Sequence, residues 1–239
     1  MANLVLHKAE SRGHANHGWL DSHHTFSFAN YYNPDRMGFG ALRVLNDDRV
    51  DQGMGFGKHP HDNMEIISIP LSGDLEHKDS MGNIAVIKSG DIQVMSAGTG
   101  ITHSEYNKNT DQVAKFLQIW VIPNKRNVKP RYDQITINAE DLQNNLHQIV
   151  SPYQDDEGVW IHQNAWFHLG NFDKDVAVEY KVKLAGNGVY AFVINGQFTI
   201  ENIHLDSRDG LGITDTSSFT IKSDSHDSEI LLMEVPMKF

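Results

Sequence analysis

The sequence predicts an all-β protein made of two β-rich halves. Short runs rich in Val, Ile, Phe and Thr recur along the chain, and glycine-containing turn signals separate them. The runs are spaced roughly eight to twelve residues apart, which is typical of a β-sandwich or barrel. One segment alone has the periodicity of a helix, so few short helices are expected.

The expected strands can be followed in chain order. In the first half they fall within residues 64–80, 82–98 and 113–123, and in the second half within 189–205, 217–223 and 228–236. Turn signals lie at 72–74, 81–83 and 89–91. Asn195 and Gly196 both tolerate positive φ and predict a hairpin turn.

The one helix candidate lies between the two halves. In NAEDLQNNLHQIV, residues 138–150, four apolar residues fall roughly on one helical face: Ala139, Leu142, Leu146 and Ile149. We expect the boundary between about residues 124 and 150. The predicted division is an N-terminal domain, 1–135, and a C-terminal domain, 136–239.

Composition limits the possible partners and compartments. The chain carries 31 acidic and 20 basic residues, a net charge of -11, without a basic cluster that would grip phosphates. Direct binding to nucleic acid or to an anionic membrane is therefore not expected. The chain has no cysteine, so disulfides and thiolate metal sites are excluded. Without a signal-peptide pattern or a long apolar run, a cytoplasmic location is expected.

Two histidines in GKHPHDNMEIISIP, residues 57–70, are spaced to act together. Side chains at positions i and i+2 of a strand point to the same face, so His59 and His61 project together while Pro60 faces the other way. Proline has no backbone N–H, which indicates a sheet edge or a barrel rim. On its own, such a pair is more often exposed or simply hydrogen-bonded.

A second pair with the same spacing favours a metal site. His103 and Glu105 lie in SAGTGITHSEYN, residues 96–107, where Gly98 and Gly100 allow a tight backbone path. Two strands that each present two ligands on one face predict a four-ligand site inside a barrel. Three imidazoles and one carboxylate suit iron, manganese, nickel, copper or zinc. Octahedral coordination would leave two positions open for a small molecule.

Other histidines and aromatic residues have more ordinary interpretations. A structural or cavity-rim role is predicted for a group near the start of the chain, with a zinc site as the alternative; the group is His14, His17, His23 and His24. His77 is predicted to be exposed, and His226 and Glu229 to be surface or cap residues. Several aromatic residues are expected either in the core or around a pocket: Phe26, Phe28, Phe39, Phe56 and Trp120.

These motifs carry a family resemblance. G-x-H-P-H-x-x-x-E at 57–65 resembles the first cupin motif, and GDIQVMSAGTGITHSEYN at 90–107 resembles the second. Together with RGHANHGWLDSHHTFSFANYYNPDRMGFGALRVLNDD at 12–48, they make the chain similar to the pirin family, and most of all to its bacterial quercetinase-like members. The resemblance covers most of residues 10–135 and thins after about 150.

The resemblance implies a bicupin, in which two cupin-type barrels (double-stranded β-helices) pack together. It implies one divalent metal per chain, usually Fe²⁺ with Mn²⁺, Ni²⁺, Co²⁺, Cu²⁺ and Zn²⁺ as alternatives. The residues that match the family's ligands are His59, His61, His103 and Glu105. Glu65 matches a ligand of other cupins, and its spacing from His61 predicts the same inner face, so we expect it to orient a ligand or a water. The C-terminal barrel, which lacks a His-X-His pair, is expected to hold no metal.

Two functions are implied. The first is a quercetin 2,3-dioxygenase-like enzyme that opens flavonols with O₂ and uses Glu105 as both ligand and base. The second is a non-enzymatic redox sensor whose metal changes affinity for a protein partner. A deep cavity at the metal would favour the enzyme, and a shallow covered site would favour the sensor.

Overall fold

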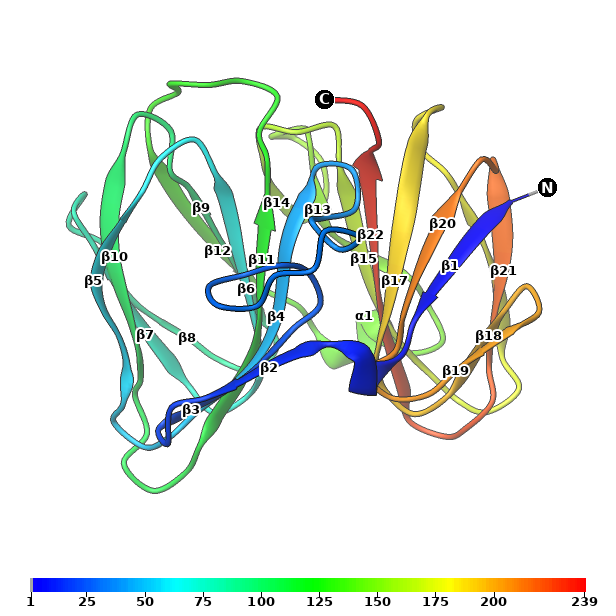
Figure 1. The fold of residues 1–239 in the computed structure, drawn as a ribbon, viewed down its shortest axis with the longest axis horizontal. Helices are drawn as coiled ribbons and strands as arrows, with labels where there is room; N and C mark the ends of the chain where they lie inside the picture. The colour runs from blue at the N-terminus through cyan, green and yellow to red at the C-terminus, as the bar shows by residue number, and fades with distance from the viewer. Residues whose placement is uncertain (1) are drawn as a thin grey trace.

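The computed structural model describes residues 2–239 and consists of two β-barrels that lie side by side (Figure 1). Each barrel pairs a seven-stranded sheet with a four-stranded sheet. The helices of residues 2–239 are a single 3-10 turn, η1 (Ala9–Ser11), and the one-turn α1 (Ala139–Leu142). The predicted all-β architecture of two packed barrels with few short helices is confirmed. Neither helix could cross a membrane.

The N-terminal barrel contains eleven of the strands. Its large sheet has the order β12-β9-β6-β11-β4-β3-β2 and its small sheet the order β5-β10-β7-β8. The bounds are β2 Gly13–Asn16, β3 Leu20–His24, β4 Leu42–Val50, β5 Gly55–His61, β6 Glu65–Ser72, β7 Leu75–Asp79, β8 Ile84–Ile87, β9 Asp91–Ser96, β10 Ile101–Asn107, β11 Ala114–Val121 and β12 Arg131–Thr136.

The C-terminal barrel is built in the same way. Its large sheet has the order β1-β20-β17-β22-β15-β13-β14 and its small sheet the order β16-β21-β18-β19. The bounds are β1 Asn3–His7, β13 His147–Ser151, β14 Val159–Trp160, β15 Trp166–Phe172, β16 Ala177–Lys181, β17 Asn187–Asn195, β18 Phe198–Ile200, β19 Ile203–Leu205, β20 Gly210–Thr214, β21 Ser218–Ser223 and β22 Ser228–Pro236.

The largest apolar core lies between the two barrels, where the seven-stranded sheets pack face to face. Strand alternation makes this possible. On β11, Leu117 and Ile119 enter the core between the barrels, whereas Gln118 and Trp120 line a cavity inside the N-terminal barrel. A strand buried on both faces therefore carries apolar residues on one face and a mixture on the other.

The interiors of the two barrels differ in chemistry. The C-terminal barrel is filled by one continuous apolar cluster that includes Phe172, Phe198 and Phe219. Inside the N-terminal barrel the apolar residues form two smaller clusters, one around Phe116 and one around Met95. The N-terminal interior thus has polar side chains around a cavity, whereas the C-terminal interior packs its apolar cluster beside a buried hydrogen-bonded group in which Tyr180 donates to Glu234.

The helix expected over residues 138–150 is wrong beyond its first turn. Gln143 is extended and Asn144 has a φ of 54°, so the helix ends at Leu142. Residues 147–151 form β13 instead, with Ile149 and Val150 fully buried in the core between the barrels. Pairing of β13 with β15 and burial of two β-branched side chains in the core between the barrels outweigh the weak helical periodicity.

The turn at Asn195–Gly196 is also not a hairpin. Gly196 has the predicted positive φ, 78°, but β17 belongs to the large sheet and β18 to the small one. The turn therefore carries the chain from one face of the barrel to the other. By contrast, the signal at 81–83 does join two paired strands, β7 and β8.

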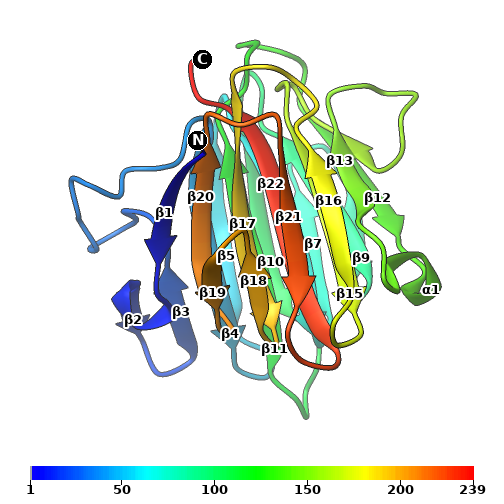
Figure 2. The same cartoon turned by 90° about the vertical axis from the view of Figure 1, so that its right-hand side faces the viewer.

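The first strand crosses the predicted division at residue 135. β1 pairs along its whole length with β20, from Asn3 opposite Thr214 to His7 opposite Gly210. Figure 2 shows it at the edge of the C-terminal sheet. An ion pair continues the contact, because Lys8 Nζ lies 2.5 Å from a carboxylate oxygen of the buried Asp209.

Candidate metal centre

β5 and β10 bring the three predicted histidines together. The strands are antiparallel neighbours in which His59 lies opposite His103 and His61 opposite Ile101. The ring centroids of the three imidazoles are 4.4 to 4.9 Å apart, and one nitrogen of each lies within 4.8 Å of the others. β5 is an edge strand, as Pro60 between the histidines indicates.

Glu105 lies next to His103 on β10 but in a second, overlapping group. Its carboxylate is buried and accepts hydrogen bonds from Ser68 Oγ at 3.0 Å and Gln118 Nε2 at 2.8 Å. Its oxygens are within 4.8 Å of ring nitrogens of His103 and His77. The pairing with β5 shifts register between His103 and Glu105, so the carboxylate is set deeper in the barrel than the histidine pair.

His77 is the site residue that the sequence reasoning missed, and its predicted exposure is wrong. It is fully buried on β7, with its ring 5.3 Å from that of His103 and its Nε2 3.2 Å from Asp79 Oδ2. The signal was the alternation in LEHKD, which buries Leu75 and His77 and turns Glu76 and Lys78 toward solvent.

The donor set fits a divalent transition metal. Both ring nitrogens of buried His103 lack a hydrogen-bond partner, which is uncommon for buried polar atoms. His59 Nδ1 lies 2.7 Å from the Gly57 carbonyl, an arrangement that leaves Nε2 free to bind a metal. Burial and the neighbouring His59 lower the pKa of His61 to about 4 and that of His103 further. The imidazoles of His61 and His103 are therefore neutral, as metal ligands must be.

The predicted orientation of Glu65 is wrong. The residues between β5 and β6 form a tight turn in which Asn63 has a φ of 45°, and this resets the alternation counted from His61. Ile66 and Ser68 face the barrel interior, while Glu65 faces the other barrel and accepts a hydrogen bond from Ser96 Oγ at 2.6 Å. Burial raises the pKa of Glu65 to about 7.

A cavity of about 510 Å³ opens beside the histidines. Its aromatic wall is a series of rings packed edge to face. The ring centroids of Phe28 and Trp120 are 5.4 Å apart, and those of Trp120 and His61 are 5.0 Å apart. Phe56 also lines the cavity. Of the aromatic residues considered from the sequence, Phe26 lies in the core between the barrels and Phe39 packs against it.

A polar part of the lining comes from β3 and β4, which follow β11 in the same sheet. Four buried residues line it: Ser22, His24, Asn46 and Asp48. Burial raises the pKa of Asp48 to about 7, and Ser22 Oγ donates a hydrogen bond to it. The signal for this wall was Asn46 and Asp48 at i and i+2 of β4, on the same face as the apolar Val44 and Val50.

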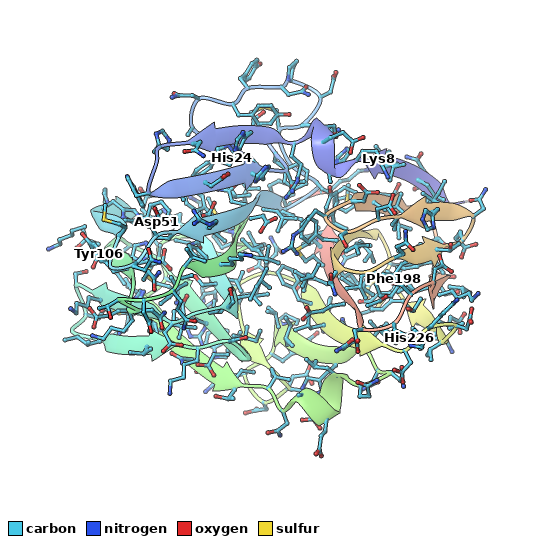
Figure 3. All side chains as sticks on the ribbon, turned by 90° about the horizontal axis from the view of Figure 1, so that it is seen from below. Lys8, His24, Asp51, Tyr106, Phe198 and His226 are labelled. Atoms are coloured by element: carbon cyan, nitrogen blue, oxygen red, sulfur yellow. The ribbon has the colours of Figure 1, made fainter. Side chains whose placement is uncertain are left out.

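The remaining histidines occupy varied positions. His14, His17 and His24 line the cavity, in agreement with a rim role, and Figure 3 shows His24 on the strand pair that flanks the N-terminal barrel. His226 is exposed at the outer edge of the C-terminal barrel, and Glu229 is partly buried. Within residues 2–239, all three groups of possible metal ligands belong to the N-terminal barrel.

Comparison with known proteins gives consistent matches over nearly the whole chain. The family model Pirin matches residues 5–121, and the model of the quercetinase C-terminal cupin domain matches residues 148–235. The chain is 44% identical over 233 residues to the quercetin 2,3-dioxygenase of Escherichia coli strain K12, covering 98% of this chain and 99% of the relative. It is 35% identical over 223 residues to a pirin-like protein of Caulobacter vibrioides, covering 93% and 95%.

The match extends to a solved structure. The crystal structure of the bacterial pirin YhhW from Escherichia coli in complex with nickel(II) has a TM-score of 0.92 and 44% identity to this chain. The alignment covers 98% of this chain and 99% of that one.

Proposed function

The chain belongs to the pirin family and has a bicupin fold, and on that premise we propose that it is a metal-dependent dioxygenase that opens flavonols such as quercetin with O₂. The observation that carries the proposal is a cavity of about 510 Å³ beside three converging histidines. Ligand pockets of drug-sized molecules span roughly 300–1,000 Å³, so a flavonol fits this space. A cavity of this volume beside the histidines favours the enzyme over the sensor.

In this proposal His59, His61, His103 and Glu105 hold one divalent metal, with Fe²⁺ as the first choice and Mn²⁺, Ni²⁺, Co²⁺, Cu²⁺ and Zn²⁺ as alternatives. Two findings support it: the unpartnered nitrogens of His103 and the nickel(II) in the Escherichia coli relative. We also propose that the metal-binding domain lies within residues 1–135 and that 136–239 form a domain without metal, to whose sheet β1 adds a strand. Within residues 2–239, the three groups of possible metal ligands all lie in the N-terminal barrel, which supports that division of roles.

The bound metal would hold the deprotonated hydroxyl of the flavonol and lower the cost of its negative charge. Glu105 takes up the proton of that hydroxyl on a carboxylate oxygen. Burial raises the pKa of Glu105, with the nearby His77 opposing, and a raised pKa makes the carboxylate a better proton acceptor. Ser68 and Gln118 keep the carboxylate in place through their hydrogen bonds.

The two walls of the cavity position the substrate. Phe28 and Trp120 present ring edges and faces to a flat aromatic molecule. Asn46 and Asp48 lie among the polar groups of the neighbouring strands and can bind its other hydroxyl groups. The walls also limit the entry of water.

The test is oxygen consumption measured together with the loss of quercetin's visible absorbance, on protein of known metal content. Glu105→Gln should lose turnover, because an amide can offer an oxygen to a metal but is a poor base. Glu65→Gln is the matched control, since its side chain faces the other barrel, and it should keep the metal and most activity. Normal turnover by Glu105→Gln at full metal occupancy would show that the base is misassigned. A wild-type protein that consumes no oxygen with any flavonol, after loading with each candidate metal, would favour the sensor.

A further inference from the structure

We propose that the β2–β3 hairpin carries a second, exchangeable site for a divalent transition metal, formed by His14, Asp21 and His23. These residues are separate from the ligands proposed for the buried centre. Their ligand atoms all lie within 4.8 Å of one another. Unlike the buried centre, this group is partly open to solvent, with side-chain exposures of 52%, 31% and 39%.

The geometry follows from the pairing of the two strands. His14 lies directly opposite His23 in the antiparallel hairpin, and Asp21 precedes His23 by two residues, so the three side chains share one face. The rings of His14 and His23 are stacked, with centroids 4.6 Å apart. Ser22, between Asp21 and His23, points the other way and lines the cavity.

One carboxylate oxygen of Asp21 lies near a ring nitrogen of each histidine in the group. Asp21 Oδ1 lies 2.8 Å from His14 Nε2 and 3.8 Å from His23 Nδ1. Asn16 Nδ2 lies 3.4 Å from the other oxygen, Oδ2, and steadies the carboxylate. A metal ion would replace the hydrogen now shared by His14 and Asp21 and would draw in His23.

The ligand chemistry selects the ion. Two imidazoles and one carboxylate favour Zn²⁺, Cu²⁺, Ni²⁺ or Co²⁺ over Mg²⁺ and Ca²⁺, which prefer oxygen ligands. Asp47 lies opposite His23 on β4 but is paired with Arg12 and Arg208, so we do not count it as a ligand. Three protein ligands leave the other positions to water, and the ion should exchange readily.

Such an ion would brace the hairpin whose inner face forms the polar wall of the cavity. β2 is the edge strand of the seven-stranded sheet and has β3 as its neighbour there. Metal binding by His14 of β2 with Asp21 and His23 of β3 would therefore fix the spacing of these two strands, of which β3 turns Ser22 and His24 to the cavity.

The experiment is a calorimetric titration of Zn²⁺ into full-length protein whose buried centre has been loaded with Ni²⁺, with Ni²⁺ retention checked by elemental analysis. We expect one additional Zn²⁺ per chain. His14→Ala and His23→Ala should each weaken this event by about tenfold or more, a loss of about 1.4 kcal/mol. All three side chains are solvent-accessible, so the variants should fold normally, which circular dichroism would verify.

Two controls separate this site from others. His204 is an exposed histidine beside two carboxylates, Asp206 and Asp224, but has no second imidazole, so His204→Ala should leave the event unchanged. The double variant His59→Ala with His61→Ala should also retain it. The proposal is overturned if no additional Zn²⁺ binds, if binding survives both hairpin variants, or if either control abolishes it.

Discussion

Replacing Glu65 by glutamine should make the stability of the protein less sensitive to pH. The carboxyl lies on the face of β6 that packs against the C-terminal barrel, and burial raises its pKa from 4.5 to about 7, with the Ser96 hydroxyl and Arg131 opposing. Between these two pH values the unfolded chain releases a proton that the folded protein keeps. The free energy of unfolding of the wild type therefore falls as pH rises through this window.

The magnitude follows from the two pKa values, which differ by about 2.5 pH units. Each unit corresponds to about 1.36 kcal/mol, so the carboxylate costs up to roughly 3 kcal/mol above pH 7 and nothing below pH 4.5. Glutamine has the same shape, still accepts a hydrogen bond from Ser96 and does not titrate. The stability of Glu65→Gln relative to the wild type should therefore rise by up to that amount between about pH 5 and about pH 8.

The assay is urea unfolding of both proteins at the two pH values, at equal metal content. Other buried carboxyls, such as Asp48, titrate in both proteins and cancel in the comparison. Glu140→Gln, on the exposed first turn of α1, is the control and should show no such pH-dependent difference. If the difference between Glu65→Gln and the wild type is the same at both pH values, or shrinks as pH rises, the carboxyl is not protonated in the folded protein and the reasoning fails.

Three further predictions concern the metal and the cores. Elemental analysis of protein purified without chelators or nickel affinity resin should find about one tightly bound metal per chain. The double variant His59→Ala with His61→Ala should lose this metal and His204→Ala should keep it. Tightly bound metal in the double variant would refute the assignment. Stripping the metal should leave β-type circular dichroism and a cooperative melt at a lower temperature, because two barrels bury enough apolar surface to fold alone; loss of the β signal would show the metal to be a structural staple. Phe198→Ala should destabilise the C-terminal barrel by about 3–5 kcal/mol in urea unfolding, because the side chain is fully buried in its apolar cluster; a cost below about 1 kcal/mol would mean that the barrel interior collapses around the gap.

The sequence was most informative where local pattern and chemistry agree. Alternation and glycine turns predicted the strands, and the pairs at i and i+2 predicted three histidines on adjacent strands of one barrel. Pro60 predicted an edge strand for a physical reason, its missing N–H, and β5 is one. These are properties of a few neighbouring residues, so they can be read without knowing the rest of the fold.

The failures arise where distant residues decide. Counting from His61 to Glu65 assumed a continuous strand, but the turn at Asn63 reverses the inward and outward positions. The helical pattern of 138–150 loses to the burial of Ile149 and Val150 against the other barrel's sheet. His77 was predicted to be exposed because its sequence neighbours are charged. Strand alternation alone would have placed it on the same buried face as Leu75.

The placement of β1 has a consequence for how the protein is made. Its partner strand β20 is more than two hundred residues away in the chain. The first strand to leave the ribosome therefore cannot form its strand pairing until nearly the whole chain has been synthesised. During synthesis the N-terminal barrel can close on itself while β1 and the sheet that will face the second barrel stay uncovered. The C-terminal sheet is therefore complete only when both ends of the chain have been synthesised. Either barrel expressed alone would expose the apolar face that the other barrel covers in the full-length protein.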